Sequence, residues 1–252
     1  MTTAEKLLQI SEGVDKVEAL NTELAQTLYG GDTGYRGHYD EFWDEFQKYG
    51  NRTRYMSGFA GDGWTNKTFK PKYNIAGNQS MSSLFYACGI KGDLVEILSN
   101  AGVTLDTSKT TSLNSAFNST YITRVGVISC EGITSASGCL QIFIQSTKLV
   151  TIDKLILKSD GSQKLTSSFD GCSALENLTI EGVIGQNGFD VQYSPKLSKA
   201  SITSIINALS TTTNGLTVTL SKTAVESAFG STTSTEWTNL IGTRSNWTIS
   251  LV

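Results

Sequence analysis

Phenylalanine recurs at a fixed interval in the middle of this chain. Phe117, Phe143 and Phe169 are separated by 26 residues each, and apolar residues follow the last two at similar short steps. A repeat of about 20–29 residues forms one supersecondary unit, which is too small to bury its own apolar face. Neighbouring units must therefore stack into a ladder. A ladder of this kind offers a broad surface, which favours binding over catalysis.

The clearest copy of the repeat is the segment 169–180. Its apolar residues step by three and end in an alternating strand, which is typical of leucine-rich repeats. We expect these side chains to point inward: Phe169, Cys172, Leu175, Leu178 and Ile180. Weaker copies are Phe85, Ile90, Leu94, Ile97; then Phe117, Ile122, Val125, Val127; and, shortened, Phe189, Val191, Leu197, Ala200, Ile202. The alternative is a β-rich domain in which the phenylalanines recur by chance.

The phrase Phe-x-x-Cys-x-x-Leu-x-x-Leu-x-Ile in segment 169–180 resembles the BspA-like class of leucine-rich repeats. Members of this class occur in bacterial surface proteins and in virion proteins of bacteriophages that infect gut bacteria. Segments 39–53 and 197–209 are also similar to phage-encoded proteins of that group. The resemblance covers roughly residues 39–252 and implies a leucine-rich-repeat solenoid that is tail-fibre-like or associated with the baseplate.

We expect an α+β chain in which an N-terminal helix, a possible coiled coil, precedes an irregular leucine-rich-repeat solenoid with a mixed α/β C-terminal cap. The expected parts are residues 1–29, an oligomerisation or attachment helix; 30–79, a glycine-rich joint and aromatic cap; 80–205, the solenoid; and 206–252, the C-terminal cap. Within the cap, the pattern predicts helices at 201–209 (with Ser201 as N-cap), 223–229 and 235–241, and strands at 216–220 and 247–252.

The first 29 residues carry apolar side chains at seven-residue intervals, as in the a and d positions of a coiled coil. An asparagine at an a position costs stability but specifies register and oligomer number. The expected oligomerisation residues are Leu7, Ile10, Val14, Val17, Asn21, Leu24 and Leu28. The alternative is an amphipathic helix that packs on its own domain. Segment 38–49 is expected to be a short aromatic helix that covers the first repeat.

Charged residues make up 17% of the chain, and the net charge is −3. The sequence contains no run of lysine and arginine, whereas nucleic-acid binding needs a basic footprint, so we expect no nucleic-acid partner. We find no secretory signal and no apolar stretch long enough for membrane insertion. A surface-type repeat without an export signal fits a virion component made in the host bacterial cytoplasm.

Chemistry-bearing residues are few. The chain has one histidine and four cysteines, and the cysteines lack the paired spacing of a zinc site, so we expect no metal, no cofactor and reduced thiols. Adjacent carboxylates in segment 38–49 do not form a convincing glycosidase pair. We therefore expect no enzyme, but a phage virion protein that contacts other virion proteins. The alternative is a bacterial surface adhesin or protein-interaction module.

The expected ligand is a host surface glycan or protein, held by shallow contacts. Exposed polar and aromatic side chains within the repeats suit such recognition. The candidates are Tyr121, Gln141, Gln145, Gln192 and Tyr193.

Deletion of residues 1–29 should leave the repeats folded but lower the oligomeric state. The physical reason is that the seven-residue apolar pattern would be lost while the glycine-rich segment 30–37 separates it from the repeats. Light scattering of the full and shortened chains measures this. Equal masses for two monomeric proteins would contradict self-association through the helix.

Overall fold

The computed structural model describes residues 74–76, 80–87, 90–135 and 137–252, and every structural statement below concerns these residues. The expected N-terminal helix with Leu7, Ile10, Val14, Val17, Asn21, Leu24 and Leu28 lies outside the described residues, as do the glycine-rich joint and the aromatic helix at 38–49.

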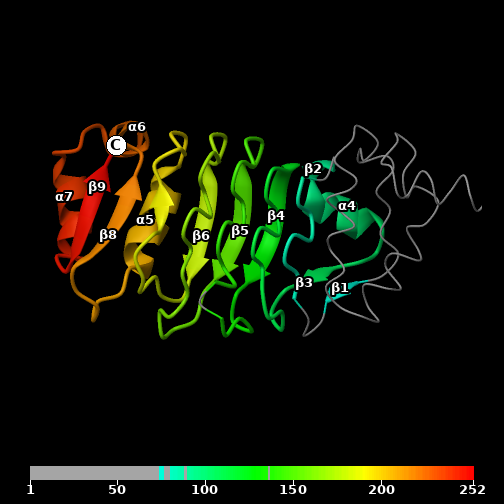
Figure 1. Cartoon of the computed structure of the whole chain (residues 1–252). Coiled ribbons are helices and arrows are strands. Elements are labelled where there is room, and N and C mark those ends of the chain that lie inside the picture. The colour runs from blue at the N-terminus through cyan, green and yellow to red at the C-terminus, as the bar shows by residue number, and fades with distance from the viewer. Residues whose placement is uncertain (1–73, 77–79, 88–89, 136) are drawn as a thin grey trace, which may run out of the picture.

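The described chain combines helices with parallel sheets. The largest sheet contains β2 (Lys91–Asp93), β4 (Tyr121–Ser129), β5 (Thr151–Ile156) and β6 (Asn177–Glu181), paired in parallel and in the order of the sequence. Figure 1 shows these strands side by side, with α4 (Leu94–Asn100) and the pair β1 (Ile75–Ala76) and β3 (Leu105–Asp106) at one end. Because parallel neighbours need a return connection, each strand is followed by a segment that leads the chain back to the start of the next.

The returning segments carry the recurring phenylalanines, which form a buried column. Neighbouring ring centroids from Phe85 through Phe117, Phe143 and Phe169 to Phe189 lie 5.3, 5.4, 5.7 and 5.4 Å apart. All five rings are at most 1% exposed. Aromatic pairs at this separation stabilise a fold by about 0.5–1.5 kcal/mol each beyond the area they bury. The interval in the sequence thus corresponds to one step of the column.

Backbone hydrogen bonds join the returning segments around Phe85, Phe117, Phe143 and Phe169, each to the next. The N–H groups of Gln141, Phe143 and Gln145 donate to carbonyls in segment 166–170, at 3.1, 3.0 and 2.6 Å. Segments 83–87 and 115–119 donate to their successors in the same way. The residues two before and two after Phe85, Phe117, Phe143 and Phe169 have positive φ, for example 56° at Gln141 and 59° at Gln145. This conformation is uncommon for residues other than glycine, and the alternation directs every second N–H towards the next segment.

Burial follows the repeat in its clearest copy. Phe169, Cys172, Leu175, Leu178 and Ile180 are all buried, as the pattern predicts.

Two residues of the weaker copies do not point inward. Val127 is 49% exposed, because Val125 and Ile128 pair with Ile152 and Leu155, and this three-residue step turns the residue between them outward. Ala200 is exposed because it lies on a helix whose neighbouring residue, Ser201, faces the sheet.

Helix α5 (Lys199–Ala208) covers the edge of the large sheet beside β6 (Figure 1). The N–H groups of Leu178 and Ile180 donate to the hydroxyls of Ser201 (2.9 Å) and Ser204 (2.8 Å). An exposed sheet edge is a site for unwanted strand pairing, and these hydroxyls replace the missing strand. The sequence-based N-cap at Ser201 was therefore wrong. Ser198 caps the helix by accepting from the N–H of Ser201.

The last part of the chain closes this end with a second parallel sheet and two helices. Its strands are β7 (Asp190–Val191), β8 (Leu216–Leu220) and β9 (Trp247–Leu251), and its helices are α6 (Lys222–Phe229) and α7 (Thr235–Gly242). Trp237 is 1% exposed and lies 5.3 Å from Phe229, centroid to centroid. The predicted strands and helices of this part are confirmed to within one or two residues.

Replacing Ser201 with alanine should lower the free energy of unfolding by about 1–3 kcal/mol, because the buried N–H of Leu178 would lose its acceptor. Chemical denaturation followed by circular dichroism measures the change. Thr203 lies in the same helix and makes no hydrogen bond to β6 among the described residues, so Thr203→Ala is the control and should stay within about 0.5 kcal/mol of the wild type. Equal losses for the two variants would contradict edge capping.

Candidate ligand-binding groove

An open groove of about 770 Å³ crosses the end of the large sheet at which the strands begin. Its lining combines three lysines, one tyrosine and several small or hydroxyl-bearing side chains, and it contains no carboxylate. The lining residues are Lys91, Gly92, Tyr121, Thr123, Thr147, Lys148, Val150, Ser173, Ala174 and Lys196.

Three of these residues occupy the same position on successive turns. Lys148, Ala174 and Lys196 each directly precede a buried leucine. In each case the N–H of that leucine donates to the carbonyl three residues earlier, at 3.1, 3.1 and 3.3 Å. The same tight turn therefore forms each time, and it places the residue before the leucine at the equivalent position of each successive turn.

The other two residues of this row come from β2 and β4. Lys91 and Tyr121 are register partners on the two neighbouring strands, and the Lys91 Nζ lies 5.7 Å from the centroid of the Tyr121 ring. This separation is within the range of a cation–π contact. Tyr121 is 50% exposed, so the ring is open to solvent and to a ligand. Together the row reads Lys91, Tyr121, Lys148, Ala174, Lys196 across adjacent turns.

The row carries three positive charges. Lys91, Lys148 and Lys196 are exposed, and none of them forms an ion pair with another described residue. By contrast, Lys154 lies 2.8 Å from Glu181, and Lys199 lies 2.6 Å from Glu236. A concave surface with one sign of charge concentrates ligands of the opposite sign. The groove is therefore suited to an anionic ligand.

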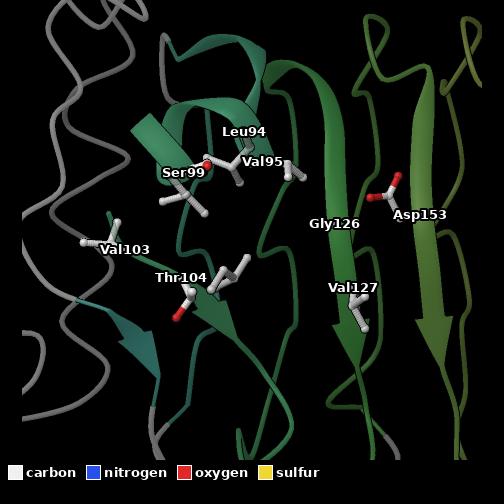
Figure 2. Close-up of a pocket in the computed structure, with 10 residues that line it drawn as sticks. Leu94, Val95, Ser99, Val103, Thr104, Gly126, Val127 and Asp153 are labelled. Atoms are coloured by element: carbon white, nitrogen blue, oxygen red, sulfur yellow. The ribbon is translucent and has the colours of Figure 1, made fainter. Parts of the chain in front are cut away.

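A second pocket, of about 380 Å³, lies between α4 and the neighbouring strands (Figure 2). Its lining is mostly apolar and includes Leu94, Leu98 and Val103. Helix α4 packs closely against β4 here because residue 126 of the strand is glycine. A Cβ at this position would lie 3.3 Å from Val95 Cγ2.

The one carboxylate that lines this pocket, Asp153, is already engaged. The guanidinium of Arg124 donates to both of its carboxylate oxygens at 2.8 Å, and also to Asp93 at 3.3 Å. The hydrogen bond to Asp153 is the main reason that the pKa of Arg124 is raised. Arg124 thus bridges neighbouring strands on the outer face of the sheet. We assign no ligand to this pocket.

The structure brings only one of the predicted ligand residues into the groove, namely Tyr121. Gln141 and Gln145 lie on either side of Phe143 in a returning segment, where their backbone conformation serves the hydrogen-bonded ladder. Gln192 bonds to Asp190 with its side-chain amide, and Tyr193 is 53% exposed just after β7. These four residues do not line the groove.

The lysines of the groove were not among the residues predicted from the sequence. No run of basic residues exists along the chain, yet the fold gathers Lys91, Lys148 and Lys196 on one surface. An alignment of the repeats would have indicated this surface, since Lys148 and Lys196 each directly precede a repeat leucine. The fold therefore gives this surface a local positive charge that no run in the sequence indicates.

We examined the described residues for metal-binding groups and activated cysteines. They contain no group of three or more histidine, cysteine or acidic side chains placed to hold a metal ion. Burial raises the pKa of the Cys172 thiol to about 12, and the neighbouring Cys139 together with burial raises the pKa of Cys130. A cysteine nucleophile needs a lowered pKa, so neither thiol is activated. Within the described part of the chain, no helix is long and apolar enough to cross a membrane.

Comparison with known protein families, with curated proteins and with solved structures finds no match to this chain.

The described thiols should be unreactive while the protein is folded. Cys130, Cys139 and Cys172 are free and buried, and Cys88 lies outside the described residues. In a Cys88→Ser variant at pH 8, an aromatic disulfide reagent should therefore release no chromophore from the native protein and should titrate three thiols in denaturant. Rapid reaction of any thiol under native conditions would contradict this burial.

Proposed function

We propose that this chain is a phage virion protein, tail-fibre-like or baseplate-associated, in which a leucine-rich-repeat solenoid of the BspA-like type recognises the host surface. The observation that carries the proposal is the open groove across successive turns, with Lys91, Tyr121, Lys148 and Lys196 along it. Its openness suits adhesion to an extended ligand, since small-molecule sites normally enclose most of their ligand.

The repeat chemistry supports the solenoid part of the proposal. The apolar positions from Phe169 to Ile180 are buried, parallel strands follow one another in sequence order, and the phenylalanines stack at one ring per turn. In a repeat protein each unit contacts mainly its neighbours, so the surface can extend without a closed pocket.

The virion part of the proposal is supported by the resemblance of segments 39–53, 169–180 and 197–209 to phage-encoded proteins of that group. In this proposal the heptad positions in residues 1–29 join copies of the chain or attach them to other virion proteins. The alternative, a bacterial surface adhesin or protein-interaction module, uses the same groove but places the protein on a cell envelope.

Gold-labelled antibodies against the purified protein should mark one fixed position on phage particles from a culture that expresses this gene, and the protein should bind intact host cells. Electron microscopy and a cell-sedimentation assay measure the two properties. Label on the bacterial envelope and none on particles would overturn the virion role in favour of the adhesin. Label on particles without binding to any susceptible host would leave a purely architectural role.

A further inference from the structure

We propose that the groove binds an extended polysaccharide that carries carboxylate or sulfate groups, with Lys91, Lys148 and Lys196 as the cationic contacts and Tyr121 as the stacking platform. The inference rests on the proposed host-recognition function and names the class of ligand for that site. All the residues to which this inference assigns a contact line the groove.

The spacing of the lysines points to a linear polyanion. In the row Lys91, Tyr121, Lys148, Ala174, Lys196, lysine occupies every second position. Neighbouring strands lie about 4.8 Å apart, so the lysine positions recur at about 10 Å. That separation is too large for one compact anion such as phosphate to contact all three ammonium groups. A chain with regularly spaced charges satisfies them together.

The remaining lining favours a sugar polymer over a nucleic acid. Single-stranded nucleic acids are held by several aromatic side chains on which successive bases stack, whereas the described lining residues include one aromatic side chain, Tyr121. None of these described lining residues is arginine, the residue that suits bidentate contacts to phosphate. Thr147 and Ser173 each directly precede a residue of the row and also line the groove, and their exposed hydroxyls can hydrogen-bond to sugar hydroxyls.

Ala174 provides a position at which affinity can be gained. It is the residue before the repeat leucine, as Lys148 and Lys196 are on the turns before and after it. A lysine side chain at this position would add a fourth charge between two existing ones. Ala174→Lys should therefore tighten binding, and Ala174→Glu should weaken it.

The experiment measures binding of the full chain to polygalacturonate and to chondroitin sulfate, with neutral dextran and a thymidine oligonucleotide as comparison ligands. We expect binding to at least one of the acidic polysaccharides and none to dextran, with an affinity that falls as salt rises because the contacts are exposed. The triple variant Lys91→Gln, Lys148→Gln, Lys196→Gln should bind about tenfold or more weakly. Ala174→Lys should bind about two- to tenfold more tightly.

The matched control makes the same loss of three positive charges outside the groove. It replaces three exposed lysines with glutamine: Lys109, Lys164 and Lys222. Its affinity should stay within about twofold of the wild type. Equal losses in the groove and control variants would mean that net charge alone governs binding, and would overturn the inference. Tighter binding to the oligonucleotide than to either polysaccharide would overturn it in favour of a nucleic-acid site.

The two proposals fail separately. If the protein binds host cells but neither acidic polysaccharide, the groove inference falls and host recognition stands. If the protein binds an acidic polysaccharide through the lysines, but antibodies against it label no particles and it binds no host cells, the ligand class stands and the proposed function falls. If the triple variant loses binding to polysaccharide and to cells in the same proportion, both are supported.

Discussion

Hydrogen bonds between successive returning segments set the geometry of the described chain. Donors such as Phe143 N–H reach the carbonyls of the next segment, and the pairs of left-handed residues that flank the first four phenylalanines of the column make this direction possible. Opposite them, the parallel strands pair in sequence order. The strand pairing and the hydrogen bonds between returning segments together keep each turn in a constant register with its neighbours. The column of phenylalanine rings fills the interior beside the returning segments.

The groove depends on that regularity. A residue on the outside of one turn, such as Lys148, lies beside the corresponding residues of adjacent turns, Tyr121 and Ala174, although they are far apart in the sequence. The backbone ladders hold the spacing of these side chains, so a repeating ligand would meet contacts that are already positioned. Preorganisation of this kind reduces the entropic cost of binding.

A stack of turns also ends in an edge strand whose backbone groups have no neighbouring strand to pair with, and one such edge, β6, is covered. Hydroxyls of Ser201 and Ser204 on α5 accept from the edge strand β6. Beyond the helix, Arg244 binds the carbonyls of Asn207 and Leu209, at 2.7 and 3.0 Å, and ties α5 to the final sheet. The helix thus replaces a strand with hydrogen-bonding side chains, which ends the sheet without exposing backbone donors.

The sequence by itself determined the buried positions in the clearest copy, such as Leu175 and Leu178, and the final helices and strands, because those depend on apolar spacing within a short stretch. It did not determine which residues share a surface. Val127 turned outward because of a local three-residue step in strand pairing, Ser201 served the sheet edge rather than its own helix, and three isolated lysines became one basic groove. Each of these outcomes depends on pairing between segments 20 or more residues apart in the sequence. Leu178 and Ser201, for example, are separated by 23 residues, and only the tertiary structure sets that register.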